Sequence, residues 1–264
     1  MALTRRQRQR LGKVLAVVVP AALAAFVAAS ADWGRLQDKF LDPGIAGDLF
    51  PRIITVAAKN TIEITAFAFA LGLVFGLVAA LLRLSPFRAY RWLGTSYVEL
   101  FRGIPALVTL ILVGIVIPIA FRWHVPGGDL GPKVLGLALV AGAYMAEVIR
   151  AGVLAVPTGQ AEAARSLGMG PARTMVSIVL PQAFRIVVPP MTNELVLLLK
   201  DSSLVFVLGT TAETVELTKF GRDAVGSTFN GTPITVVALL YLVISLPLTR
   251  LSAQLEKRGA RSRR

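Results

Sequence analysis

The stretch Glu162–Pro181 reads EAARSLGMGPARTMVSIVLP and separates two long apolar runs. Its first half is rich in alanine and other helix-forming residues, and Gly168 follows at the position where a left-handed residue often ends a helix. Just upstream, Pro157 is expected to end the preceding helix and Thr158 to cap the new one. A helix of about ten residues is too short to be stable alone in water, so it must pack on another surface. The stretch therefore predicts a docking helix between two membrane spans.

The composition indicates a membrane protein. Hydrophobic residues make up 55% of 264 residues, and charged residues only 16%, well below the roughly 25% typical of a soluble domain. The net charge is +13, but the basic residues lie between apolar runs rather than along one face, which argues against nucleic-acid binding. Cysteine is absent, so neither disulfides nor thiolate metal ligands are available. The single histidine, His124, cannot form a metal site by itself and is expected in an exposed loop.

Six segments approach the ~20 residues that a bilayer crossing requires. They are 12–31, 54–82, 97–121, 132–151, 188–209 and 232–250. The first segment also resembles a signal peptide, because a basic start precedes an apolar run. That run, Val14–Ala31, spans 18 residues and is longer than the usual apolar core of a signal peptide, so a retained span is favoured. The domain organisation predicted from these segments comprises an N-terminal part (1–53), a transmembrane domain (54–250) with a cytoplasmic loop at 155–181, and a basic tail (251–264).

The distribution of lysine and arginine predicts the orientation. Most basic residues precede the first span, follow the second and fourth spans, or lie in the C-terminal tail. An even number of spans with both termini in the cytoplasm fits this pattern. The segments 32–53 and 210–231 then lie on the outer side, where their mixture of aromatic and charged residues is typical of the membrane interface.

The docking helix carries a recognisable motif. Glu162-Ala163-Ala164, three residues, Gly168, nine residues and then Ile178-Val179-Leu180-Pro181 resembles the EAA signature of the permease subunits of binding-protein-dependent ABC importers. Three further stretches, 97–105, 143–152 and 199–204, resemble the polar amino-acid (histidine/glutamine-type) permeases of that family. The resemblance covers roughly residues 55–250, and the first span is an addition at the N-terminus.

This resemblance implies an all-α membrane protein with the type I ABC importer permease bundle of about six transmembrane helices. The chain would be a transporter subunit of the cytoplasmic membrane, not an enzyme, and would translocate amino acids of the glutamine, glutamate, histidine and arginine class. The implied ATPase-coupling residues are Glu162, Ala163, Ala164, Gly168, Ile178, Leu180 and Pro181. Gly168 would allow a sharp exit from the helix, and Pro181 would break the interfacial helix before the next span.

The implied partners follow from the same resemblance. The sequence has no G-x-x-x-x-G-K-[ST] loop, so this chain is expected to bind no cofactor, and ATP and Mg²⁺ would be held by a separate ATPase dimer. The other expected partners are a second permease subunit, identical or related, an extracytoplasmic solute-binding protein and the amino-acid solute.

Polar residues inside apolar segments are candidates for the substrate path, because uncompensated burial of such groups in a membrane is costly. They are Glu147, Asn193, Glu194, Lys200, Asp201, Ser202 and Ser203. An amino-acid zwitterion needs both an anionic and a cationic neighbour, which this group could supply. Lys200 could instead pair with Asp201 or Glu147 and simply order the bundle. Glu99 and Arg102 are expected to anchor a helix end at the membrane surface.

The sequence leaves the solute open. Ile104 and Thr109 stand where the family usually has threonine and glutamine, which weakens any assignment of one amino acid. An intramembrane enzyme would need a nucleophile with its base or a carboxylate pair at membrane depth, and the sequence offers neither in one span. A passive channel or scaffold would not account for the alanine-rich docking helix.

Overall fold

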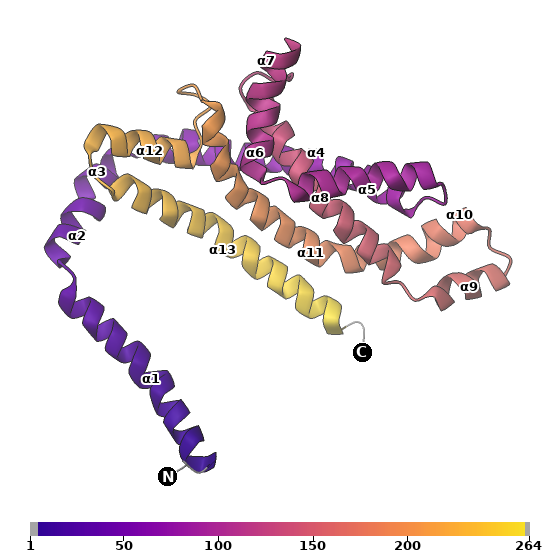
Figure 1. The fold of residues 1–264 in the computed structure, drawn as a ribbon, viewed down its shortest axis with the longest axis horizontal. Helices are drawn as coiled ribbons and strands as arrows, with labels where there is room; N and C mark the ends of the chain where they lie inside the picture. Colours follow the sequence, from indigo (N-terminus) through magenta and orange to yellow (C-terminus); the bar gives the residue numbers. More distant parts are fainter. Residues whose placement is uncertain (1–4, 262–264) are drawn as a thin grey trace.

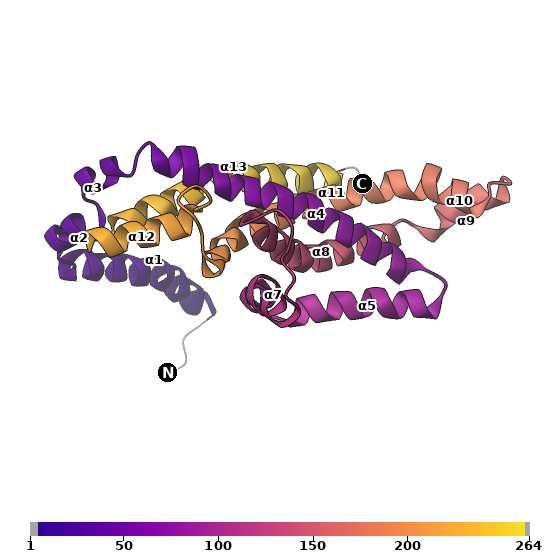
Figure 2. The same ribbon diagram turned by 90° about the horizontal axis from the view of Figure 1, so that it is seen from above.

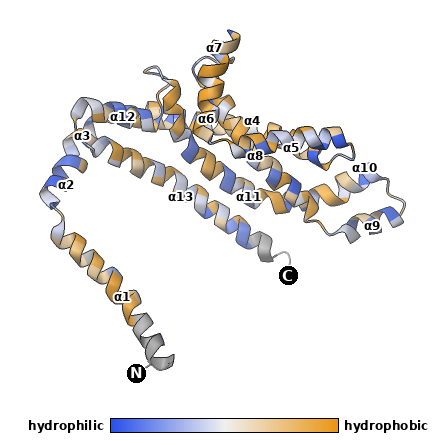
Figure 3. Ribbon diagram, in the orientation of Figure 1, coloured by the Kyte–Doolittle hydropathy of each residue, from blue (hydrophilic) through white to orange (hydrophobic). Residues whose placement is uncertain are grey.

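The computed structural model describes residues 5–261, and within this range the regular secondary structure is entirely helical. Four helical stretches in the described part are long and apolar enough to cross a membrane. They are Ile53–Leu84 (η1, Ile53–Ala58; α4, Lys59–Leu84), Leu130–Leu154 (α8), Pro171–Leu208 (α10, Pro171–Thr174; η3, Met175–Val179; α11, Leu180–Asp201; η4, Ser202–Leu208) and Thr232–Lys257 within α13 (Thr232–Arg261). Figure 3 shows apolar residues along the first part of α13 and polar residues towards its end.

Two further apolar stretches are bent. The first joins α1 (Arg5–Ser30) to α2 (Trp33–Phe40) and α3 (Pro43–Asp48), with a bend of 79°. The second joins α5 (Arg88–Gly103) to α6 (Ala106–Ile111), η2 (Leu112–Val116) and α7 (Ile117–Phe121), with a bend of 107°. The segment 97–121, predicted as one span, is therefore not a single helix. Pro105 supplies no backbone N–H, and Ile104 before it is extended with φ −97° and ψ 133°, the conformation that a following proline favours.

The helix containing the predicted fifth span begins earlier than expected. Its helical run starts at Pro171 rather than at 188 and continues to Leu208. The prediction that Pro181 breaks this run is wrong, because Pro181 is the second residue of α11. A proline ring inside a helix clashes with the carbonyl four residues earlier. Here the π-helical turn η3 lies directly before α11, and its wider coil contains that carbonyl, so the run continues through the proline.

The centre of the bundle is the pair α4 and α8, which share the most extensive contact between any two helices described. Glycine allows the two backbones to approach closely. A Cβ atom on Gly76 of α4 would lie 2.8 Å from Cβ of Met145 and 3.0 Å from the backbone oxygen of Gly142, both on α8. Beside this contact, the buried side chains of Ile64, Leu110 and Val205 join the same hydrophobic cluster, so that α4, α6 and η4 all pack around α8.

The bundle is elongated, and polar elements lie at its two ends (Figure 1). At one end are α9 (Thr158–Ser166) and α10, which we call the α9 end. At the other end are α2, α3 and α12 (Leu217–Thr228), which we call the α12 end. Helix α13 runs from the α12 end towards the α9 end, and the view in Figure 2 shows α4 and α13 extending along the same axis.

In the part of the chain that the structure describes, the N-terminal helices join the bundle at the α12 end. The backbone N–H of Gly231 donates to the oxygen of Lys39 at 2.7 Å, and the Asn230 side chain donates to the oxygen of Asp38 at 2.7 Å. The backbone N–H of Asp42 donates to the Thr232 hydroxyl at 3.0 Å. Helix α1 runs away from these contacts (Figure 1), and its large apolar side chains from Val14 to Val27 are exposed where the structure describes them.

Candidate functional site

The docking helix predicted from the sequence is α9. Its first residue is Thr158, and Pro157 occupies the capping position without a side-chain hydrogen bond, so the prediction that Thr158 caps the helix is wrong. At the other end, Gly168 has φ +84°, the left-handed conformation expected of it. The N–H of Gly168 donates to the oxygen of Arg165 at 2.9 Å, and the N–H of Met169 to that of Ala164 at 3.1 Å. This pair of bonds is the Schellman ending of a helix.

Helix α9 packs on the bundle through its alanines. Ala164 is buried, and Ala161, three residues earlier on the same side, packs against the buried cluster of Val156, Val179 and Ala183. The opposite side of the helix is exposed: Glu162, Ala163 and Arg165. Leu167, just after it, is 85% exposed. The helix therefore presents a small surface with charges of both signs and one unprotected apolar side chain.

The second half of the motif connects α9 to the bundle interior. Ile178 lies in the turn η3, and Leu180 and Pro181 begin α11. Val179 between them is buried in the same cluster as Val156 at the end of α8. The motif thus brings the base of α9, the end of α8 and the start of α11 into one packed group.

A cavity of about 420 Å³ opens between three helices. The break between α5 and α6 forms one wall, and α8 and α11 form the others. Its lining residues are Arg102, Gly103, Ile104, Pro105, Ala106, Leu137, Val140, Ala141, Tyr144, Glu194, Leu197, Leu198 and Asp201. The chain bends by 107° at this break, and residues on both sides of the bend line the cavity.

The charged side chains of the cavity are one guanidinium and two carboxylates. Glu194 and Asp201 are seven residues apart on α11, two helical turns, and so lie on the same side. Arg102 has its Cζ atom 5.2 Å from the centre of the Tyr144 ring. Among residues 5–261, no ion pair joins Arg102 to either carboxylate. The cavity therefore offers both signs of charge to a ligand, with a formal excess of one negative charge.

The structure separates the other predicted path residues from this cavity. Asn193 and Lys200 are exposed, and Ser202 is buried with its hydroxyl donating to the oxygen of Leu199 at 2.6 Å. Ser203 is half-buried in η4. Lys200 forms an ion pair with neither Asp201 nor Glu147 in the described part of the chain.

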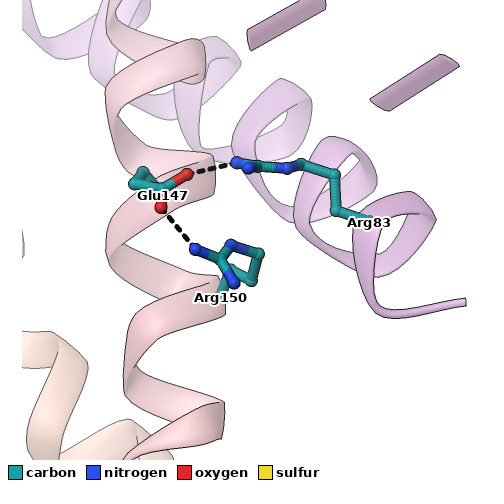
Figure 4. A network of polar contacts seen from close by, with 3 residues as sticks. All are labelled: Arg83, Glu147 and Arg150. Carbon is teal, nitrogen blue, oxygen red and sulfur yellow. Dashed lines mark hydrogen bonds and ion pairs between the residues drawn. The ribbon is translucent and has the colours of Figure 1, made fainter. Parts of the chain in front are cut away.

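Glu147 lies elsewhere on α8 and is held by two arginines. Its Oε2 atom accepts a hydrogen bond from Arg83 of α4, and its Oε1 atom accepts one from Arg150 at 2.6 Å (Figure 4). The cavity in turn includes two polar side chains, Arg102 and Tyr144, that were not predicted for it. Arg102 was expected only to anchor a helix end, and Tyr144 was not singled out. The Gly103-Ile104-Pro105 break was the signal in the sequence that could have placed Arg102 at a cavity.

Neither the cavity nor the exposed loops indicate metal chemistry. His124 is exposed, as expected. Over the described range, no group of three or more histidine, aspartate and glutamate residues is arranged to hold a metal ion.

Long apolar helices around a cavity with three charged side chains, and a short helix exposed at one end, fit a membrane-embedded transport subunit. The chain belongs to the family described as "Binding-protein-dependent transport system inner membrane component", which matches residues 72–261. The similarity recognised in the sequence is thereby confirmed, and the chain is a multi-pass membrane permease subunit.

Individual relatives agree with this assignment. The "L-cystine transport system permease protein TcyB" of Bacillus subtilis is 36% identical over 172 residues, which cover 65% of this chain and 68% of that protein. The "Glutamate/aspartate import permease protein GltK" of Escherichia coli O157:H7 is 34% identical over 213 residues, 76% of this chain and 90% of that protein.

Solved structures confirm the predicted fold. A chain from the "Crystal structure of an amino acid ABC transporter with histidines" superposes with a TM-score of 0.74 at 33% identity and covers 83% of this chain and 99% of its own. The methionine transporter MetNI, at 20% identity, has a TM-score of 0.66 and shares the fold. The predicted all-helical, type I importer permease bundle is thus confirmed.

Proposed function

We propose that this chain is the permease subunit of an ATP-driven importer of polar amino acids, and that the solute passes through the cavity between α5, α8 and α11. The observation that carries the proposal is the cavity itself, which combines Arg102 with two carboxylates inside a bundle related to amino-acid permeases. A volume of about 420 Å³ lies within the range of small-molecule sites.

The charges of the cavity match an α-amino acid. The Arg102 guanidinium can bind the α-carboxylate through two parallel hydrogen bonds, and one carboxylate of α11 can accept from the α-ammonium group. The second carboxylate is then left for the solute side chain. Two carboxylates on one side of a helix repel each other, and a cationic side chain between them relieves that repulsion. We therefore expect cationic amino acids such as arginine, lysine or protonated histidine to bind in preference to neutral and then acidic ones.

Helix α9 is proposed to couple transport to a separate ATPase. Its alanine side packs on the bundle, so the exposed Glu162, Arg165 and Leu167 are free to enter a groove on a partner. ATP and Mg²⁺ would be held by the ATPase, and the α9 end would face the cytoplasm, with both chain termini.

The remaining partners follow from this orientation. The α12 end would face a solute-binding protein outside the cytoplasm, and a second permease subunit, identical or related, would complete the transport unit. The family description and the titles of the similar structures support this assembly in general terms.

Uptake by purified complexes tests the proposal. The complex, isolated through a tag on this chain, is reconstituted in proteoliposomes with its binding protein, and uptake of labelled arginine, lysine, histidine, glutamine and glutamate is measured with and without ATP. We expect uptake to depend on ATP and to be faster for the cationic amino acids than for glutamine and glutamate. Failure of an ATPase to co-purify, or uptake that is independent of ATP, would contradict the proposal.

A further inference from the structure

Glu147, Arg83 and Arg150 form a polar group that does not line the cavity. We call these three residues the triad. The Glu147 carboxylate on α8 accepts hydrogen bonds from Arg83 on α4 and from Arg150 one turn further along α8 (Figure 4). The three side chains are between 17% and 30% exposed. Only the bond from Arg83 joins two helices; the bond from Arg150 stays within α8.

The triad lies between the cavity and the docking helix. Tyr144, Glu147 and Arg150 follow one another at intervals of three residues, so each lies beside the next on α8. Tyr144 lines the cavity, and α8 ends at Leu154, four residues before α9 begins at Thr158. A displacement of α9 that travels along α8 towards the cavity wall therefore passes Arg150 and Glu147.

The connection from α9 to α8 is tightly packed. Val156, between the two helices, is 7% exposed and packs with Ala161 of α9 and Val179 of η3. Four residues earlier, a Cβ atom on Gly152 would lie 2.2 Å from a methyl carbon of Val187 on α11. Close packing of this kind transmits a displacement rather than absorbing it, so α8 has to follow α9.

Helix α4 has no comparable link to α9. It ends at Leu84, and its last turn is followed by Ser85 in extended conformation. Near this end the packing between α4 and α8 consists of small side chains, Ala79 and Ala146, with Val98 of α5. The Arg83–Glu147 ion pair is the polar bond that fixes this last turn of α4 to α8.

We propose that Glu147 is a positioning residue that makes α4 move together with α8 when the docking helix is displaced. Through Arg83 it fixes the last turn of α4, beyond the close glycine contacts of the two helices, to α8, so that the end of α4 moves with the cavity wall on α8 when α9 is displaced. Arg150 holds the carboxylate in place and does not itself join the helices. This inference rests on the proposed function, because it assigns a role in transmitting the movement of α9.

Two single variants separate this role from simple charge neutralisation. Arg83→Gln removes the bond between helices and leaves Glu147 paired with Arg150. Arg150→Gln leaves the bond between helices and removes the one within α8. In both variants the carboxylate keeps one arginine, so neither leaves an unpaired buried charge, which would be strongly destabilising. Arg88→Gln, at the exposed first residue of α5, is the matched control for loss of an arginine.

The measurement is the number of solute molecules imported per ATP hydrolysed, in proteoliposomes that contain the whole complex. Coupling between distant sites typically changes affinities by about 5-fold or more, so we expect Arg83→Gln to lower this ratio about fivefold while ATP hydrolysis continues. Arg150→Gln and Arg88→Gln should stay within about twofold of the unmodified complex on the same scale. Equal losses in Arg83→Gln and Arg150→Gln would overturn the inference, as would an unchanged ratio in Arg83→Gln.

A charge exchange keeps the inference testable if Arg83→Gln fails to assemble. Arg83→Glu and Glu147→Arg each place like charges together, whereas the double variant restores an opposite-charge pair between α4 and α8. We expect the double variant to recover the import ratio that either single variant loses. No recovery in an assembled double variant would overturn the inference. If the unmodified complex itself shows no ATP-driven uptake, the proposed function fails instead.

Discussion

The hydroxyl of Tyr97 on α5 donates a hydrogen bond of 2.8 Å to the backbone oxygen of Leu139 on α8. This bond fixes the helix that leads into the break at Ile104 and Pro105 against the helix that forms the facing cavity wall. Gly142 lies next to it: a Cβ atom there would be 2.6 Å from the Tyr97 hydroxyl oxygen and 2.8 Å from Cβ of Phe75. Three helices therefore meet at a position that tolerates only glycine.

Gly142→Ala is accordingly expected to destabilise the permease by about 1–3 kcal/mol, the usual cost of overpacking a filled core. The thermal unfolding temperature of the purified protein in detergent should fall. Gly159→Ala is the matched control, because nothing lies within 4 Å of a Cβ atom at that helical position. Equal unfolding temperatures for the two variants would contradict the close approach of α4, α5 and α8.

Gly168→Ala should strain the end of α9, since φ is +84° at this position and the left-handed conformation costs a residue with a side chain about 1–2 kcal/mol. We expect the protein to remain in the membrane but to lose coupling, seen as ATP hydrolysis without matching uptake. Gly170→Ala is the control, because φ is −66° there and no atom lies within 4 Å of its Cβ position. Normal transport by Gly168→Ala would argue against α9 as the coupling helix.

Glu162→Ala, on the exposed side of the same helix, should uncouple in the same manner without straining the backbone.

Asp201→Asn should weaken uptake of cationic amino acids more than uptake of glutamine. A hydrogen bond to a charged group contributes about 1.5–3 kcal/mol, which corresponds to a loss of roughly tenfold to a hundredfold in apparent affinity. Lys200→Gln is the neighbouring control, because this side chain is exposed and does not line the cavity. The apparent KM for arginine and for glutamine in each variant provides the measurement. An equal change for both solutes would remove Asp201 from side-chain recognition.

Acid pH should loosen the loop between η4 and α12. The Asp129 carboxylate accepts hydrogen bonds from the Thr214 hydroxyl at 2.7 Å and the Thr211 N–H at 3.2 Å. The Thr214 bond is the main reason that the pKa of Asp129 lies below its ordinary value. A lowered pKa means that this bond contributes stability above the ordinary aspartate pKa of about 3.9. The contribution is lost as the pH falls through the lower value in the folded protein.

Hydrogen exchange at the Thr211 amide provides the test of this pH dependence. Relative to neighbouring amides, protection at Thr211 should decrease as the pH is lowered below about 4, the range in which aspartate is protonated. In Asp129→Asn the extra decrease should disappear, because the amide side chain does not titrate. A pH dependence that persists in this variant would assign the effect to another group.

Much of the fold could be predicted from the sequence, because the length of an apolar run and the residues that start or end a helix depend only on neighbouring positions in the chain. The docking helix with Gly168 at its end, the long apolar helices and the polar segments at both ends follow from residue types along the chain. The break at Pro105 and the continuation through Pro181 show the limit of this approach. Both positions carry proline, and whether the helix stops depends on a preceding π-helical turn and on neighbouring helices.

The site was harder to predict because it depends on contacts between residues that are distant in the sequence. Glu194 and Asp201 were identified because carboxylates within an apolar segment are conspicuous. Arg102 lines the same cavity because the chain bends after Gly103. Glu147 was assigned to the same group, whereas the structure pairs it with Arg83, 64 residues earlier. No spacing rule indicates such a pair.

The N-terminal helices are held at the turn 230–232 by hydrogen bonds from residues 38–42 and by contacts of α2 and α3 with α13, which has a consequence for the modularity of the chain. None of the buried clusters described above includes a side chain of α1. Among the side chains that the structure describes, the cavity wall, the triad and the base of α9 thus have their packing partners outside the first helix. We therefore expect the transport machinery to tolerate changes in the length of this helix.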